Sequence, residues 1–381
     1  MIATVVLCPD QLHSYGSQIF AGLYELKYRR EIDLRLSVRG FPEPPKGSKH
    51  REIIAMRLIV ENSSRPINVV IDLIDGTSIS NDQYFDWADV YLKSSLGLSS
   101  GLRQHEKVLP FGLRYACTSP NESVFDRLLF CLIGVQRKPR SWSTTVTQPA
   151  HLLLSRFKAT QELCKLPPNI EFFEGNSESV EPVIYYRTRV YDPTENVSTY
   201  AQKEFPKVNA MRVSCIRALR EAFGSAFLGG IRDSAYARRY CPDLVLENSW
   251  GWRDHVNASR RSLVCVTTSG LFNSIDWKLL EYFAAGRAVV SERLKLDLPR
   301  PPLENRDFLS FTNAEECVDQ CRRVLNSRDD LAPKLRSNAT TYYQTHCTPL
   351  ATMRLAILES VRLVSESENP ELGRSLSLVS N

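Results

Sequence analysis

Apolar positions along the chain fall into two alternating patterns. At the start of the chain, an apolar, β-branched run covers residues 2–8, apolar side chains recur at helical spacing over residues 14–30, and polar and apolar positions alternate over residues 32–38. Continuous apolar runs are typical of parallel strands covered on both faces, whereas spacing of three and four residues is typical of amphipathic helices. Strands that alternate with helices predict an α/β fold with a parallel sheet.

A second α/β series begins after the polar, turn-rich segment EGNSESVEP. Strand-like runs cover residues 183–191, 225–231 and 262–268, and an amphipathic helix pattern covers residues 208–223. A chain of 381 residues has room for two domains. The predicted organisation is a first domain at 1–178, a second at 179–345, a closing helix at 346–364 and a mobile polar tail at 365–381.

The segment DWKLLEYFAAGRAVVSE carries the most specific pattern in the chain. Asp276 suits a helix N-cap and Gly286 a C-terminal stop, which predicts a helix of about nine residues between two apolar strands. The free backbone N–H groups at its start favour an anion. The small residues of the preceding loop, 269–274, which contains Asn273 and Ser274, would let a phosphate come near.

Two charged residues lie on one side of this predicted helix. Lys278 lies in the first turn, where the helix dipole disfavours a cation, so a bound phosphate would explain its charge. Glu281 follows one turn later, and a carboxylate there can accept two hydrogen bonds from a vicinal diol such as that of a ribose. The alternative is an ordinary surface pair between Lys278 and Glu281 on a helix that only covers the sheet.

The string KLLEYFAAGRAVVS closely resembles the donor-binding segment of GT-B glycosyltransferases of the "glycosyl transferases group 1" type. The resemblance implies two Rossmann-like domains that face each other across a cleft, with a C-terminal helix crossing back to the first domain. In that family the glutamate matching Glu281 holds the donor ribose. Many retaining members carry a second glutamate eight positions upstream, where this chain has Asn273. A direct carboxylate contact to the sugar is therefore not expected here.

Such enzymes usually present cations to the donor diphosphate at the end of the first strand of the second domain. Arg187 and Arg189 alternate with apolar neighbours, so we expect both on one face of that strand, where guanidinium groups suit phosphate oxygens. The alternative is a salt-bridged strand end. Gly230, with Gly229, either lines the base pocket or makes a tight turn. The donor-binding candidates are thus Arg187, Arg189, Gly230, Asn273, Ser274, Lys278 and Glu281.

The first domain is expected to supply the acceptor side and any general base. The candidates at its strand ends are Asp10, His13, Tyr15 and Gly16 after the first strand, and Asp75 and Thr77 after the strand at 67–75. Asp75 is the first choice for a base, because a carboxylate at the carboxyl edge of a parallel strand is open to a ligand. His13 is the second choice, and Arg187 is the third catalytic candidate, as the stabiliser of the leaving diphosphate.

The composition of the chain limits the kinds of partner that the protein can be expected to bind. A formal charge of +5 spread among mixed signs does not indicate nucleic acid. No run predicts a signal peptide or a membrane span, so a cytoplasmic protein is expected, with peripheral contact at the inner membrane face as a minor option that some GT-B enzymes use. The ten cysteines occur singly, which predicts reduced thiols and no metal site. The only small-molecule requirement expected is the nucleotide sugar itself, with no separate cofactor.

The resemblance implies transfer of a sugar from a nucleotide-diphosphate donor to a glycan, lipid-linked or other acceptor, in the setting of surface polysaccharide synthesis. A metal-independent enzyme is expected, with retention slightly favoured over inversion. Two alternatives stay open at this point. One is a nucleotide-sugar epimerase on a GT-B-like fold, and the other is a non-catalytic nucleotide-sugar-binding protein on the same scaffold.

Overall fold

A computed structural model of the protein describes most of the chain in two compact units. The described residues are 2–8, 16–43, 52–61, 63–122, 125, 126, 129, 167–175, 180–194, 199–246 and 251–368. Unit 1 comprises Met1–Glu171 and Cys347–Asn381, and unit 2 comprises Phe172–His346. Among the described residues, no helix is long and apolar enough to cross a membrane.

Unit 1 is built on a sheet with the strand order β2-β1-β3-β4-β5-β6. Its strands are β1 (Ala3–Leu7), β2 (Ile32–Leu36), β3 (Ile53–Ile59), β4 (Ile67–Asp72), β5 (Val90–Lys93) and β6 (Val108–Pro110). Neighbouring strands run parallel, except that β3 is antiparallel to both β1 and β4. The prediction of a wholly parallel sheet is therefore wrong at β3, whose apolar run was not assigned to any element.

Helices cover both faces of this sheet. Within the described part of unit 1, they are α1 (Ser17–Tyr28), α2 (Asp82–Trp87), a 3₁₀ helix (Gly101–Gln104) and the C-terminal α12 (Pro349–Glu368). Successive side chains of a strand point to opposite faces. Accordingly Ile54 and Met56 of β3 pack in the cluster with α1 and α12, whereas Ile53 and Ala55 pack in the cluster with α2.

The C-terminal helix belongs to unit 1. Helix α12 contacts α1, β4 and β5. A Cβ atom on Gly22 of α1 would lie 2.2 Å from the carbonyl oxygen of Pro349, so a glycine is what lets the two helices approach so closely. The expectation that a closing helix returns to the first domain is confirmed.

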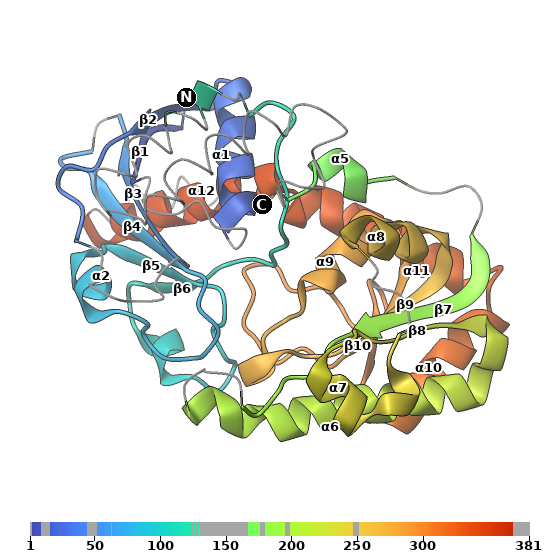
Figure 1. Cartoon of the computed structure of the whole chain (residues 1–381). Helices are drawn as coiled ribbons and strands as arrows, with labels where there is room; N and C mark the ends of the chain where they lie inside the picture. The colour runs from blue at the N-terminus through green and yellow to red at the C-terminus, as the bar shows by residue number, and fades with distance from the viewer. Residues whose placement is uncertain are drawn as a thin grey trace. The chain divides into compact units, whose positions relative to one another are not determined.

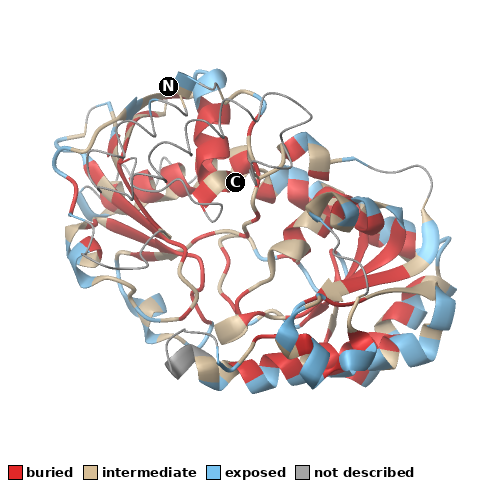
Figure 2. Ribbon diagram, in the orientation of Figure 1, coloured by how far each residue is buried: buried red, intermediate tan, exposed pale blue. Residues whose placement is uncertain are grey.

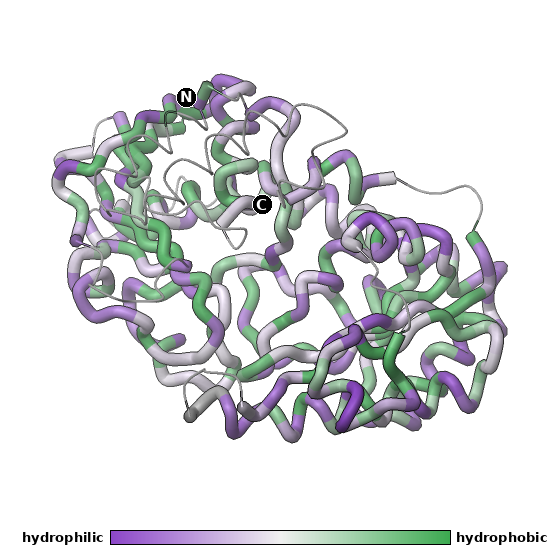
Figure 3. The backbone as a smooth tube through the Cα atoms, in the orientation of Figure 1, coloured by the Kyte–Doolittle hydropathy of each residue, from purple (hydrophilic) through white to green (hydrophobic). Residues whose placement is uncertain are grey.

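Unit 2 contains a wholly parallel sheet with the order β11-β10-β9-β7-β8. Its strands are β7 (Glu181–Thr188), β8 (Phe227–Ile231), β9 (Ser262–Thr267), β10 (Ala288–Glu292) and β11 (Leu309–Phe311). Every residue of β9 and β10 is buried, as expected for strands covered on both faces. Figures 2 and 3 show that much of this sheet is buried and hydrophobic, although the start of β7 is exposed. The order is that of a doubly wound, Rossmann-like fold, which confirms the predicted fold class.

The helices of unit 2 lie on two faces of this sheet (Figure 1). Helices α6 (Thr199–Phe223) and α10 (Ala314–Asn326) contact each other on one face. On the other face, α9 (Trp277–Ala284) contacts both α8 (Trp252–Arg261) and α11 (Leu331–Tyr342). The chain therefore leaves β7 toward one face and β9 toward the other. In doubly wound sheets such a switch point is where ligands bind, at the carboxyl ends of the strands.

The remaining elements of unit 2 are short. They are α5 (Ile170–Phe173), where the chain passes from unit 1 to unit 2, α7 (Ala235–Tyr240), 3₁₀ turns at Gly224–Ala226, Pro242–Leu244 and Leu271–Asn273, and a π-helical turn at Tyr343–Cys347. Helix α10 is capped by Asn313, whose side chain accepts a hydrogen bond from the backbone N–H of Glu316.

Candidate functional site

Hydrogen bonds connect the carboxyl ends of β7 and β9, and the loops that follow them, at the switch point. The Tyr186 hydroxyl of β7 lies 2.9 Å from the Thr268 hydroxyl. The Arg212 guanidinium, from α6, donates to the carbonyl oxygen of Arg189 at 2.8 Å and to that of Ser269 at 3.4 Å. Arg212 is only 3% exposed. A buried cation thus holds the floor of the region where a ligand of this fold is expected.

Sequence reasoning did not single out Arg212, although a signal was present. Arg212 lies four residues after Val208 and four before Ile216, which places it on the apolar stripe of a long helix. A cation at such a position needs partners inside the protein. Its partners are backbone carbonyls of distant loops, which one sequence does not identify.

The loop before α9 adopts an unusual backbone. Phe272 and Asn273 have φ angles of 57° and 59°, in the left-handed region. The turn is closed by hydrogen bonds from the Gly270 N–H to the Ser274 oxygen at 2.7 Å and from the Ser274 N–H to the Leu271 oxygen at 2.9 Å. Asparagine tolerates this conformation better than glutamate does. The backbone therefore gives a physical reason for an asparagine at position 273.

The start of α9 is capped from within the protein. The Asp276 carboxylate accepts a hydrogen bond from the backbone N–H of Lys278 at 3.2 Å, and Gly286 ends the helix with a φ of 62°, so both predicted ends are confirmed. The Lys278 ammonium lies 2.8 Å from the other oxygen of Asp276. Burial raises the pKa of Asp276, but the charges of Lys278 and Arg212, together with the hydrogen bonds from Lys278, hold it below its usual value.

This pairing corrects one step of the sequence argument. The charge of Lys278 is neutralised by Asp276, so it gives no independent indication of a phosphate. The alternative interpretation, a surface pair between Lys278 and Glu281, is also wrong, because each residue has a different partner. The donor-binding role of Lys278 remains a prediction.

Glu281 is held by a histidine that the sequence analysis did not select. Its Oε2 atom lies 3.0 Å from His255 Nε2 on α8, and His255 Nδ1 lies 2.7 Å from the Tyr185 hydroxyl on β7. The Glu281 and His255 side chains are 14% and 12% exposed. Nothing in the sequence around His255 marks it, because its partners lie on separate elements and only the fold brings them together.

Arg187 lies on the same strand face as Tyr185 and is hydrogen-bonded to it. Burial lowers the pKa of Arg187, although the guanidinium stays charged at neutral pH, and burial raises the pKa of Tyr185. Strand β7 ends at Thr188, so Arg189 follows the strand and its guanidinium lies 4.5 Å from the ring centre of Tyr191. Arg189 thus lies just beyond the strand that carries Arg187, and the phosphate-binding role of the two arginines remains a prediction.

The paired glycines of β8 permit a close approach to neighbouring backbone. Gly229 and Gly230 have φ angles of 154° and 157°. A Cβ atom on Gly229 would lie 1.9 Å from the Tyr186 oxygen, and one on Gly230 would lie 2.6 Å from the Leu244 oxygen. Both glycines belong to the strand, so the tight-turn interpretation is wrong. A base-lining role for Gly230 remains a prediction.

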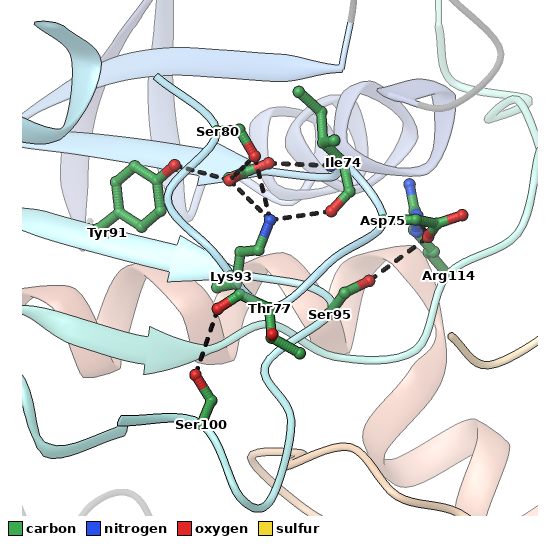
Figure 4. A network of polar contacts seen from close by, with 10 residues as sticks. Ile74, Asp75, Thr77, Ser80, Tyr91, Lys93, Ser95, Ser100 and Arg114 are labelled. Atoms are coloured by element: carbon green, nitrogen blue, oxygen red, sulfur yellow. Dashed lines mark hydrogen bonds and ion pairs between the residues drawn. The ribbon is translucent and has the colours of Figure 1, made fainter. Parts of the chain in front are cut away.

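In unit 1, a buried ion pair joins the carboxyl ends of β4 and β5 (Figure 4). Lys93 Nζ lies 2.8 Å from Asp72 Oδ2, and neither side chain is exposed to solvent. The hydroxyls of Tyr91 and Ser80 each donate to the same carboxylate oxygen at 2.6 Å. Lys93 also donates to the Ile74 oxygen at 2.9 Å. These contacts fix the loop that follows β4.

That loop carries two of the predicted acceptor-side residues. Asp75 lies three residues beyond the end of β4, has a side chain 39% exposed and is paired with Arg114 at 3.2 Å. The carbonyl oxygen of Thr77 accepts from the Ser100 hydroxyl at 3.2 Å. Gly16 precedes α1, where a Cβ atom would lie 2.8 Å from Ile54 Cδ1. The other three candidates, Asp10, His13 and Tyr15, lie outside the described residues.

The sequence analysis did not select Glu52, a further carboxyl at this edge of the sheet. Glu52 precedes β3, and its backbone oxygen accepts from the Leu73 N–H at 2.8 Å. Burial raises the pKa of Glu52 to about 7, with Arg114 lowering it and the charges of Asp75 and Asp72 adding to the rise. A carboxyl that titrates near neutral pH suits acid or base chemistry.

No protein-family model and no curated protein matches the chain. Solved structures do resemble it. Sucrose-phosphate synthase from Thermosynechococcus elongatus has 13% identity, a TM-score of 0.38 and coverage of 92% of this chain and 93% of its own. A glycosyltransferase from Rickettsia africae has 11% identity, a TM-score of 0.39 and coverage of 90% and 73%. The C-terminal domain of a glycosyl transferase group 1 family protein from Francisella tularensis has 8% identity, a TM-score of 0.31 and coverage of 46% and 96%.

The Rossmann-like assignment rests on the strand order of the two sheets and on the helices that cover them.

Proposed function

We propose that unit 2 binds a nucleoside-diphosphate sugar at the carboxyl ends of β7 and β9, and that the protein is a glycosyltransferase. The observation that carries the proposal is the placement of Glu281. It lies on the helix that follows the switch-point strand, and one of its two oxygens is held by His255. A carboxylate has lone pairs for several hydrogen bonds, so Glu281 can still accept from the hydroxyls of a ribose.

Arg187 is the proposed contact of the diphosphate. It projects from the strand face that also carries Tyr185, at the carboxyl end of β7, and it keeps its positive charge at neutral pH. A guanidinium binds phosphate oxygens in a forked geometry and gains strength where water is partly excluded. The backbone N–H groups of the loop before α9 are further donors for this group.

In the proposed reaction, the bond between the anomeric carbon of the sugar and the diphosphate oxygen breaks, and the electron pair leaves with the nucleoside diphosphate. A hydroxyl oxygen of the acceptor forms the new bond to that carbon on the face from which the diphosphate leaves, so that the configuration is retained, and it loses its proton to a base. Arg187 stabilises the charge that develops on the leaving group. We assign the acceptor to unit 1 and the base to Asp75, and we expect the reaction to need no metal and to retain the anomeric configuration.

The test is a titration of nucleotides against the wild type and Glu281→Gln. We expect UDP, GDP or ADP to stabilise the wild type against heat and to bind in calorimetry. Glu281→Gln should weaken that binding by about 1 to 3 kcal/mol, because charge-assisted hydrogen bonds are lost. Glu315→Gln, an exposed carboxylate in the first turn of α10, is the matched control and should bind as the wild type does.

Incubation with the corresponding nucleotide sugars separates the alternatives. Release of nucleoside diphosphate supports the transferase. Binding without any release favours the non-catalytic binding protein, and a changed sugar on an intact nucleotide favours the epimerase. If no nucleotide binds the wild type, the proposal is wrong.

A further inference from the structure

Four side chains from three elements of unit 2 form one continuous polar chain. Arg187 and Tyr185 lie two residues apart on β7 and are hydrogen-bonded to each other. The Tyr185 hydroxyl lies 2.7 Å from His255 Nδ1, and His255 Nε2 lies 3.0 Å from Glu281 Oε2. The chain therefore runs from a cation to a carboxylate through a phenol and an imidazole.

The hydrogen-bonding capacity of each group fixes the direction of this chain. A guanidinium has only donors, so Arg187 donates to the Tyr185 oxygen. The hydroxyl hydrogen of Tyr185 is then directed to His255 Nδ1, which accepts it. A neutral imidazole with an accepting Nδ1 carries its hydrogen on Nε2, and that N–H donates to Glu281. Burial favours the protonated hydroxyl of Tyr185, which keeps the donor in place.

Packing restrains the imidazole as well. The buried ring of Tyr282 lies 5.9 Å from the His255 ring and 6.4 Å from the Tyr185 ring, between centroids. Among the described residues, His255 thus supplies a donor to one oxygen of Glu281. The imidazole itself is held by its hydrogen bond to Tyr185 and by its packing against Tyr282.

We propose that His255, oriented by Tyr185, is a positioning residue that sets the geometry of Glu281 for binding the ribose hydroxyls of the donor. The inference rests on the proposed function, since it concerns the same site. A residue that hydrogen-bonds to a ligand-binding group contributes to affinity by holding that group in the right orientation. When the group is held less precisely, the affinity for the ligand falls. His255 is not in contact with the ligand in this account, and its effect passes through Glu281 alone.

The test compares ribonucleotides with their 2′-deoxy counterparts, because only the ribose contact distinguishes the two. UDP, GDP and ADP, and the 2′-deoxy form of each, are titrated against the wild type, Glu281→Gln, His255→Leu, His255→Gln and Tyr185→Phe. The readout is the ratio of the two dissociation constants, with thermal stability measured in parallel. In the wild type we expect the ribose form of the nucleotide that binds to be preferred by roughly tenfold or more, as for a charge-assisted hydrogen bond.

His255→Leu should reduce this preference to a ratio near one, as Glu281→Gln should. His255→Gln should recover most of the preference, because the amide of glutamine can place an N–H donor near the position of Nε2. Tyr185→Phe should give an intermediate ratio, since the imidazole loses the donor that fixes its tautomer. This variant and His255→Gln keep the proposal testable if His255→Leu does not fold.

Different results overturn different parts. If Glu281→Gln removes the preference while His255→Leu keeps it, Glu281 needs no positioning and the inference is wrong, although the proposed function survives. Equal weakening of both forms with lower thermal stability would mark His255 as merely structural and would also overturn the inference. If the wild type binds no nucleotide, or binds both forms equally, the proposed ribose site fails and the inference fails with it.

Discussion

The buried ion pair of unit 1 yields a stability prediction that can be worked from its contacts. Asp72 and Lys93 are fully buried and 2.8 Å apart. The carboxylate accepts three further hydrogen bonds, from the hydroxyls of Tyr91 and Ser80 and from the backbone N–H of Ile74. Lys93→Met removes the cation and keeps a chain of similar length, so it tests the charge with little change in packing.

Breaking a buried pair by removing one partner typically costs about 3 to 5 kcal/mol, because the other charge is left uncompensated. Asp72 would keep three of its donors, so we expect the lower end, about 3 kcal/mol. Adding Asp72→Asn to Lys93→Met removes the stranded charge. The double variant should therefore be more stable than Lys93→Met by about 1 to 2 kcal/mol.

The assay is equilibrium unfolding in urea, fitted with two transitions because the chain has two compact units. Lys334→Met is the matched control, since Lys334 and its partner Asp330 are both exposed. We expect that control to change stability by less than about 0.5 kcal/mol. The reasoning is refuted if Lys93→Met is as harmless as the control, or if the double variant is less stable than Lys93→Met.

Three further predictions concern single positions. Because the pKa of Glu52 is raised from 4.5 to about 7, its proton is held more tightly in the folded state, and stability falls as pH rises through that window. In urea unfolding, Glu52→Gln should therefore raise the free energy of unfolding by at most about 3 kcal/mol near pH 8 and by much less near pH 5. An equal gain in stability at both pH values would contradict this prediction. Gly229→Ala should destabilise unit 2 by more than about 2 kcal/mol, because the added Cβ would meet the Tyr186 oxygen. Gly224→Ala is the control and should cost about 1 kcal/mol, because a Cβ there has nothing within 4 Å. Equal melting temperatures of the two variants would refute this difference. Asn273→Glu should cost about 1 kcal/mol in the left-handed turn, and an unchanged melting temperature would show that the turn rearranges.

Local sequence signals predicted the helices and strands well, but they did not predict the contacts between side chains of different elements. The ends of α9 followed from Asp276 and Gly286, because caps are set by a few neighbouring residues. Buried parallel strands such as β9 followed from continuous apolar runs. Strand β3 was missed, because an apolar run that pairs antiparallel between two parallel neighbours carries no mark of its direction.

The candidate site was predictable only where one element carries it. Glu281 was selected as a candidate because its helix resembles a known donor-binding segment. His255 and Arg212 were not found, since each acts through residues on other elements that only folding brings near. Lys278 was interpreted through the helix dipole alone, and the cap that neutralises it lies two residues before it.

The donor site proposed for unit 2 is tested most directly by hydrogen exchange of the wild type with and without the nucleoside diphosphate that stabilises it most. If the nucleotide binds at the proposed donor site, backbone amides in two segments of unit 2 should exchange more slowly. These are residues 186–191 at the end of β7 and residues 268–281 between β9 and the middle of α9. Protection confined to other segments, or no protection by any of UDP, GDP and ADP, would contradict the proposed donor site.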